Sequence, residues 1–210
     1  MTLDASFFDL LLSDVDLHAR WLNVMSLLEY VGFRKIVKSQ DAGGITTSTL
    51  RHLNEESRHA LLLKRLAVRT GGPRFERYDR EALLCGAEAT AYFQAVDARV
   101  ADRLGKTDGV YMGVTWLIEV RALQVYRDYD LAARARGSAS GVEGLILEET
   151  RHLEEAEAGI RAADGGRTGV PADLIDFERR AYHALGEAMT LEALRATSPL
   201  AGGRNGSVEL

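Results

Sequence analysis

A five-residue pattern occurs twice in this chain of 210 residues, at residues 55–59 and 148–152. Both copies read Glu-Glu, then Ser or Thr, then Arg-His, and they lie 93 residues apart. Each copy has an isolated glutamate on an apolar stripe upstream, Glu29 for the first and Glu119 for the second, and these lie 90 residues apart. The pattern predicts two similar halves, each of which supplies carboxylates and an imidazole to a shared site.

The apolar residues around these motifs recur at three- and four-residue steps, the period of an α-helix. Helices are predicted over about residues 6–40, 47–69, 78–104, 108–136, 140–163 and 171–196. No stretch alternates as a strand would, and only three prolines interrupt the chain. The predicted fold is therefore all-α: a four-helix bundle of two helical hairpins, joined by a long crossover connection that contains an extra helix, with one C-terminal helix. Residues 1–198 are predicted to form a single domain, and residues 199–210 a flexible tail.

Composition excludes several classes of protein. A formal net charge of −5 argues against non-specific binding to nucleic acid, which depends on neutralising phosphates. The single cysteine, Cys85, cannot form an internal disulfide or a Cys-x-x-Cys metal site. No apolar run approaches the roughly 18 residues of a membrane span, and the N-terminus lacks a signal-peptide pattern. We expect a cytoplasmic protein without a membrane partner.

The repeated motif has the spacing of a metal site. A glutamate and a histidine three residues apart on a helix lie one turn apart, so both can bind one ion. Four carboxylates on apolar stripes would each cost several kcal/mol, as an order of magnitude, if buried without compensation. Two divalent cations offset that charge, and mixed carboxylate and imidazole ligands suit iron or manganese better than zinc. The predicted ligands are Glu29, Glu56, His59, Glu119, Glu149 and His152.

The predicted cofactor is a pair of iron ions, with manganese or a mixed pair as the alternative. Each ion would have one histidine and one terminal glutamate, and Glu56 and Glu149 would bridge the two. Metal-bound histidines usually donate their other ring N–H to a carboxylate or carbonyl. We therefore predict a crossed support, in which Glu55 holds His152 and Glu148 holds His59.

At these residues the chain resembles the ferritin-like di-iron carboxylate superfamily, which includes rubrerythrin, bacterioferritin, the small subunit of ribonucleotide reductase, and bacterial tRNA and aldehyde oxygenases. The family pattern is a single glutamate followed by Glu-x-x-His, repeated once, and the chain matches it over about residues 6–163. The family's radical tyrosine would fall at Leu63, or at Ala156 in the second copy, which argues against a radical generator. One cysteine cannot build a rubredoxin domain, so the resemblance implies a separate electron donor.

The resemblance implies a di-iron oxidoreductase that activates dioxygen or peroxide, with no catalytic residues beyond the metal ligands, and we expect a homodimer. The alternative is ferroxidase activity with iron storage or detoxification. A tRNA hydroxylase is a third hypothesis, based on two arginine clusters, although the negative net charge disfavours it. These clusters are Arg65, Arg69, Arg74 and Arg77, then Arg127, Arg134 and Arg136.

Other residues near the motifs have two interpretations each. His52 shares a helix face with Glu56, and an ordinary helix-end histidine is favoured over an extra ligand or proton donor. Arg58 and Arg151 either pair with the supporting acids or lie in solvent. Tyr126 and Trp116 flank Glu119 on its stripe, and core packing is favoured over a role in electron transfer or a channel. The predicted walls of a substrate cavity are Leu62, Leu63, Leu66, Met112 and Trp116.

Overall fold

The computed structural model describes residues 3–39, 45–105, 108–163 and 169–198, and within these ranges it is all-helical. The α-helices are α1 (Ala5–Ser13), α2 (Val15–Ser39), α3 (Thr47–Gly71), α4 (Gly86–Leu104), α5 (Asp108–Ala135), α6 (Glu143–Ala163) and α7 (Ala172–Thr197). Two short 3₁₀ turns, η1 (Pro73–Glu76) and η2 (Arg80–Ala82), precede α4. The all-α prediction is confirmed. No described helix is both long and apolar enough to cross a membrane. The predicted tail at 199–210 lies outside the described residues.

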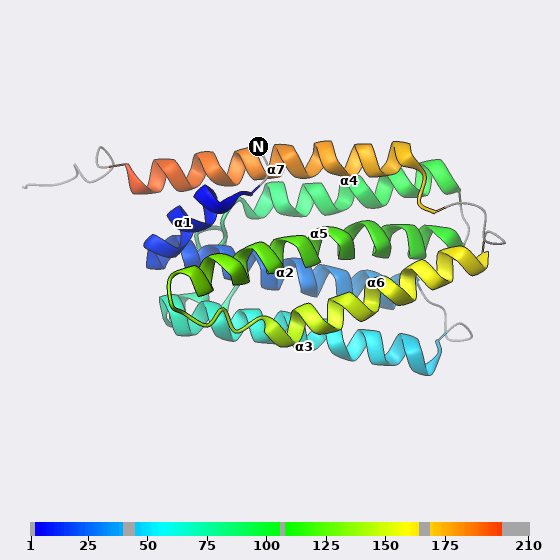
Figure 1. Ribbon diagram of the computed structural model, residues 1–210, viewed down its shortest axis with the longest axis horizontal. Helices are drawn as coiled ribbons and strands as arrows, with labels where there is room; N and C mark the ends of the chain where they lie inside the picture. The colour runs from blue at the N-terminus through cyan, green and yellow to red at the C-terminus, as the bar shows by residue number, and fades with distance from the viewer. Residues whose placement is uncertain (1–2, 40–44, 106–107, 164–168, 199–210) are drawn as a thin grey trace, which may run out of the picture.

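The long helices run back and forth along the longest axis of the molecule (Figure 1). Helix α2 packs along α3, and α5 packs along α6, so each half of the chain forms a helical hairpin. Helix α4 connects the two hairpins along the chain and runs from one end of the molecule back to the other. Helices α3 and α5 therefore run in the same direction (Figure 1). Helix α4 also contacts α2, α5 and α7, while α3 and α6 touch each other. The motif helices of both halves therefore meet.

The prediction of one helix over residues 6–40 is wrong, because the chain breaks at Asp14. The Asp14 carboxylate accepts hydrogen bonds from the backbone N–H groups of Asp16 and Leu17 at 2.8 and 2.9 Å. This capping satisfies the free donors at the start of α2 and ends α1. Helix α1 then turns Phe8 onto Trp21 of α2, with ring centroids 5.7 Å apart. The short helix thus closes one end of the core.

The prediction of a helix from residue 78 is also wrong, since α4 begins at Gly86. The buried Asn23 side chain donates to the carbonyl oxygens of Arg77 and Ala82, at 3.0 and 2.8 Å. These bonds hold the chain in short turns against α2. Helix α6 begins at Glu143 rather than 140, because Gly141 has a positive φ of 78°, which a right-handed helix does not accommodate.

Candidate metal centre

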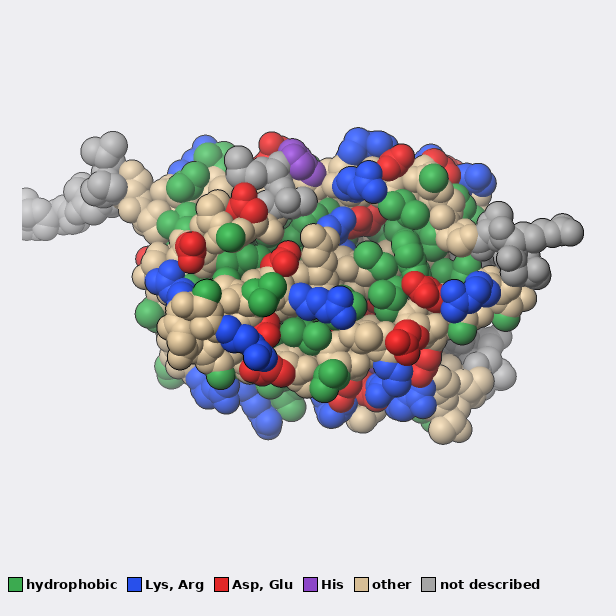
Figure 2. Space-filling model, in the orientation of Figure 1, with side chains coloured by type: hydrophobic (Ala, Val, Ile, Leu, Met, Phe, Trp, Pro, Cys, Tyr) green, Lys and Arg blue, Asp and Glu red, His purple; other side chains and the backbone are tan. Residues whose placement is uncertain are grey.

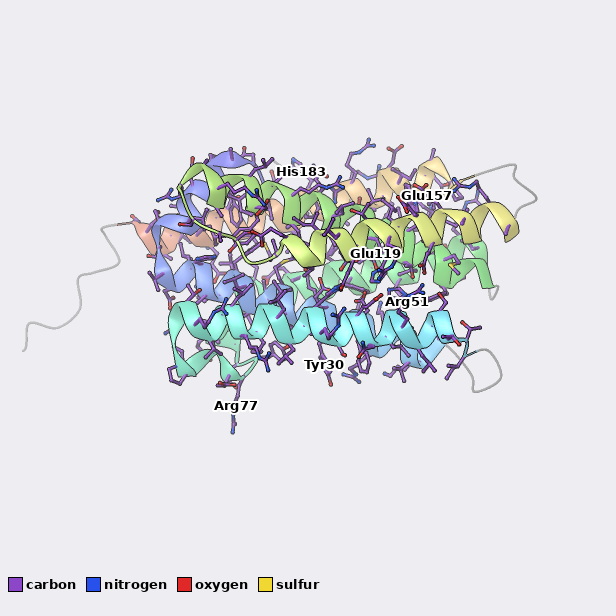
Figure 3. All side chains as sticks on the ribbon, turned by 60° about the horizontal axis from the view of Figure 1, so that its bottom comes forward. Tyr30, Arg51, Arg77, Glu119, Glu157 and His183 are labelled. Atoms are coloured by element: carbon purple, nitrogen blue, oxygen red, sulfur yellow. The ribbon has the colours of Figure 1, made fainter. Side chains whose placement is uncertain are left out.

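All six predicted ligands lie inside the molecule, where α2, α3, α5 and α6 face one another. Each is at most 8% exposed. They are Glu29 on α2, Glu56 and His59 on α3, Glu119 on α5, and Glu149 and His152 on α6. Figure 3 labels Glu119, which lies between the ribbons of α6 and α3 in that view. The structure therefore brings together the residues that the repeated motif predicts, and their role as ligands stays a prediction.

The first cluster, the Glu29 group, consists of Glu29, Glu56, His59 and Glu149. One ligand atom from each lies within 4.8 Å of the others. Nδ1 of His59 is 2.8 Å from Oε1 of Glu149 and 3.8 Å from Oε2 of Glu29. Neither His59 Nδ1 nor Glu149 Oε1 has a hydrogen-bond partner, although both atoms are buried. Buried polar atoms rarely stay unpaired, and an ion between these two would satisfy both.

The second cluster, the Glu119 group, consists of His52, Glu56, Glu119 and His152, and its ligand atoms also lie within 4.8 Å of one another. Nε2 of His52 is 3.1 Å from Oε1 of Glu56 and 3.7 Å from Oε1 of Glu119. Nδ1 of His152 is 3.6 Å from the same Glu56 oxygen. Glu56 belongs to both groups and lies between them.

Glu149 also faces both groups. Its Oε1 approaches His59 as described, while its Oε2 lies 3.0 Å from Nδ1 of His152. Each carboxylate oxygen is thus directed at a different imidazole. Such a carboxylate can hold one cation on each oxygen, which is the arrangement expected of a bridge.

Each of the two motif histidines contacts a carboxylate of the other motif helix through Nε2. Nε2 of His59 lies 2.8 Å from Oε2 of Glu148, and Nε2 of His152 lies 2.8 Å from Oε2 of Glu55. A carboxylate at Nε2 favours the tautomer that carries its proton there, which leaves the Nδ1 lone pair facing the cluster. The support therefore crosses between α3 and α6, and each imidazole presents Nδ1 to the site.

Two arginines complete this crossed arrangement. Arg58 donates to both oxygens of Glu148 at 2.8 and 2.7 Å. Arg151 lies 2.6 Å from Oε1 of Glu55. Hydrogen bonds and the positive charges help to lower the pKa of Glu55 and of Glu148, against the raising effect of burial. Both carboxylates are therefore ionised acceptors at neutral pH. Of the two interpretations of these arginines, pairing with the motif acids describes the structure.

Without cations, the negative charges of the buried carboxylates are unfavourable. Burial raises the pKa of Glu29 and of Glu119 well above the ordinary value, and the nearby carboxylates raise both further. Burial acts to lower the pKa of His59, but its contact with Glu149 and the surrounding negative charge raise it to about 10. The carboxylates around His52 raise its pKa to about 10 in the same way. The metal-free cluster thus retains protons at neutral pH, and cations would displace them.

A cavity of about 1310 Å³ adjoins the cluster, and apolar and polar side chains both line it. Its wall includes Met25, Leu28 and Ile36 of α2, Phe93 of α4, Ile118 of α5 and Met189 of α7. Of the predicted walls, Met112 alone lines it. Leu63 and Leu66 are buried in the core instead, and Leu62 and Trp116 pack against that core. The periodicity of α3 and α5 could not show that α4 and α7 supply so much of the wall.

The sequence favoured an ordinary helix-end histidine at position 52. The structure instead places this side chain within the Glu119 group. Its position four residues before Glu56, on the same helix face, was the available signal. Tyr126 was assigned to core packing, and it is fully buried, but its hydroxyl also donates to Oε1 of Glu29. Trp116 donates through Nε1 to Glu157 at 3.3 Å, away from the cluster.

Comparison of the chain with protein-family models, with curated protein sequences and with solved structures finds no match in any of the three.

Proposed function

We propose that this protein is a di-metal oxidoreductase that activates dioxygen or peroxide at the centre formed by the Glu29 and Glu119 groups. The observation that carries the proposal is the pair of buried atoms His59 Nδ1 and Glu149 Oε1, which lie 2.8 Å apart with no hydrogen-bond partner. Two ligand atoms directed at one cation would have this relationship.

The donor set supports iron, or manganese, as the metal. The two groups combine four carboxylates with three imidazoles and contain no thiolate. Oxygen donors suit manganese and imidazoles suit iron, whereas structural zinc sites favour thiolates and close at four ligands. Two divalent cations would offset the charge of Glu29, Glu56, Glu119 and Glu149. A pair of iron ions is therefore the proposed cofactor, with manganese or a mixed pair as the alternative.

Two reduced irons side by side can supply two electrons together to dioxygen or peroxide. The chain's own residues would hold and orient these ions: Glu149 directs one oxygen to each side, and Glu55 and Glu148 fix the imidazoles. The partly apolar cavity beside the cluster would admit a small or apolar substrate. Electrons would come from a separate donor protein, because a single cysteine cannot hold an iron–sulfur or rubredoxin centre.

The helix order supports the ferritin-like arrangement, since α4 carries the chain back between the hairpins and makes α3 and α5 parallel (Figure 1). The apolar part of the cavity wall favours substrate oxidation over iron storage, because hydrated iron gains nothing from contact with apolar side chains. A tRNA substrate would need a continuous basic surface. Arg134 instead pairs with Asp130 at 2.7 Å and Arg74 pairs with Asp16, and basic and acidic side chains are interspersed over the face in Figure 2.

Metal analysis of anaerobically purified protein tests the proposal. We expect two metal ions per chain, an absorbance change when oxygen or peroxide is admitted, and elution as a dimer. Glu56→Ala should lose metal, while Glu81→Ala, a change at an exposed glutamate outside the cluster, should retain it. Metal content equal in wild type and Glu56→Ala would contradict the proposal. Elution as a large shell with many irons per chain would instead support storage.

A further inference from the structure

The two halves of the centre differ at one position that the repeated motif does not cover. His52 lies four residues before Glu56 on α3, whereas the residue four before Glu149 on α6 is Leu145. Leu145 is 1% exposed and belongs to the hydrophobic core. The remainder of the motif is closely matched between α3 and α6. One half of the centre therefore has an extra imidazole where the other has a hydrocarbon side chain.

The His52 ring is oriented like a ligand. Its Nε2 faces oxygens of Glu56 and Glu119 at 3.1 and 3.7 Å, and its ring centroid lies 4.2 Å from that of His152. The His52 side chain is 12% exposed, so it is largely withdrawn from solvent. Two imidazoles and two carboxylates thus converge on the Glu119 group, against one imidazole and three carboxylates in the Glu29 group.

Tyr111 on α5 holds the other side of this ring, with its hydroxyl 3.2 Å from Nδ1 of His52. The phenol oxygen can accept a hydrogen bond from Nδ1 when that ring nitrogen carries the proton. A histidine that donates from Nδ1 has its lone pair on Nε2, the atom that faces the carboxylates. Tyr111 is therefore placed to position His52 for binding a cation.

The Glu119 group also lies along the cavity. All four of its members line the cavity wall, as does Tyr111. Of the Glu29 group, Glu29 and Glu56 reach the wall, whereas His59 and Glu149 do not line it. The side with the extra imidazole is therefore the side that faces the space where a substrate would sit.

We propose that His52 is a seventh metal ligand, positioned by Tyr111, and that it makes the cavity-facing metal position richer in nitrogen than the enclosed one. This inference rests on the proposed di-metal function. The two positions are then chemically unequal despite the near-symmetric motif. Imidazole suits iron and copper, while carboxylates suit manganese. The cavity-facing position should therefore discriminate against Mn²⁺ more strongly than the enclosed position.

The test uses the full chain and two probes, anaerobic Fe²⁺ titration and one equivalent of Cu²⁺ read by pulsed electron paramagnetic resonance. In wild type we expect two Fe²⁺ sites, and Cu²⁺ coupled to two imidazoles. His52→Ala and His52→Gln should weaken one Fe²⁺ site by at least about 10-fold and reduce the copper coupling to one imidazole. His183→Ala, at a histidine on α7 outside the cluster, should match wild type.

Tyr111→Phe removes one hydroxyl and serves if the His52 variants fold poorly. It should keep two coupled imidazoles but weaken the same Fe²⁺ site by about 10-fold or more. Unchanged Fe²⁺ affinities together with an unchanged imidazole count in the His52 variants would overturn the inference and leave the di-metal function intact. Tight Fe²⁺ binding by Tyr111→Phe, equal to wild type, would overturn the positioning role. A wild-type protein that takes up no Fe²⁺ would overturn the inference and the proposed function together.

Discussion

Nε2 of His152 on α6 lies 2.8 Å from Oε2 of Glu55 on α3. The matching contact joins His59 of α3 to Glu148 of α6 at the same distance. Each motif therefore supports the histidine of the other motif rather than its own. Adjacent acids on one helix point about 100° apart, so Glu55 cannot reach the site beside Glu56 and is available to the partner helix.

Replacing either crossed acid should loosen the metal. We expect Glu55→Gln and Glu148→Gln each to reduce metal affinity by about 10- to 100-fold, because the imidazole loses the acceptor that fixes its tautomer and orientation. Metal content after dialysis against a graded chelator series measures the effect, with exposed Glu81→Gln as the control. Equal retention in Glu55→Gln and Glu81→Gln would refute the crossed support.

Replacement of Glu29, Glu56 or Glu119 should affect the binding of different numbers of ions. Glu56 belongs to both groups, whereas Glu29 and Glu119 belong to one each. We expect Glu56→Gln to weaken both ions, and Glu29→Gln or Glu119→Gln to weaken mainly one. Stoichiometric Fe²⁺ titration with two resolved sites checks this. A Glu56→Gln variant that keeps one site at wild-type affinity would contradict the shared position.

A glycine beside the cluster offers a steric test. A Cβ built on Gly32 of α2 would lie 3.2 Å from Oε2 of Glu56, which is tight enough to displace that carboxylate by a few tenths of an ångström. Alanine in a helix interior is also favoured over glycine by about 0.5–1 kcal/mol. We expect Gly32→Ala to leave the metal-free fold as stable as wild type, or more so, while lowering metal affinity.

Gly144 of α6 supplies the matched control, because a Cβ there would meet nothing within 4 Å. Gly144→Ala should bind metal like wild type. Thermal unfolding of metal-free protein and metal titration of both variants separate the two effects. If Gly32→Ala bound metal as tightly as Gly144→Ala, the position of Glu56 would not matter to the site.

The metal-free protein should lose stability as pH rises above neutrality. The pKa values of His52 and His59 are raised to about 10 in the folded state, from an ordinary value of 6.5. The folded chain therefore binds more protons than the unfolded chain between these values. Stability falls with pH wherever the folded state holds the extra protons. The contribution is complete below about pH 6.5 and is lost as pH rises toward about 10.

Glu29 and Glu119 act in the same direction, since burial raises the pKa of each above its ordinary value. Cations should replace these protons, so metal affinity should rise with pH and binding should release protons. Unfolding midpoints of metal-free and metal-loaded protein between pH 6 and 9 check the sign. A metal-free protein that becomes more stable over this range would contradict it.

Tyr126 should contribute to the cluster through its hydroxyl. This fully buried side chain donates to Oε1 of Glu29. Tyr126→Phe leaves that carboxylate oxygen without its donor, which should cost about 1–3 kcal/mol of stability in the metal-free protein. It should also alter affinity at the Glu29 group. Tyr129→Phe is the control, because the Tyr129 hydroxyl contacts His18 at 2.9 Å. That variant should leave metal affinity unchanged.

Local sequence determined the helices and most of the cluster. The 3.6-residue period places Glu56 one turn from His59, and Glu149 one turn from His152, whatever the rest of the fold does. The repeat of the motif then indicates that two such faces meet. The break at Asp14 and the late start of α4 were missed because they depend on side chains that bond to the backbone, as Asn23 does to Arg77 and Ala82.

Only the tertiary structure decided that the His52 side chain joins the centre and what surrounds the centre. Periodicity places His52 on the correct face of α3, but the separation between α3 and α5 decides whether its ring reaches Glu119 and Tyr111. The cavity depends on how α4 and α7 pack against the hairpins, which a repeat within α3 and α6 does not encode. Spacing along a helix is fixed by its backbone, whereas distances between helices depend on the packing of the whole core.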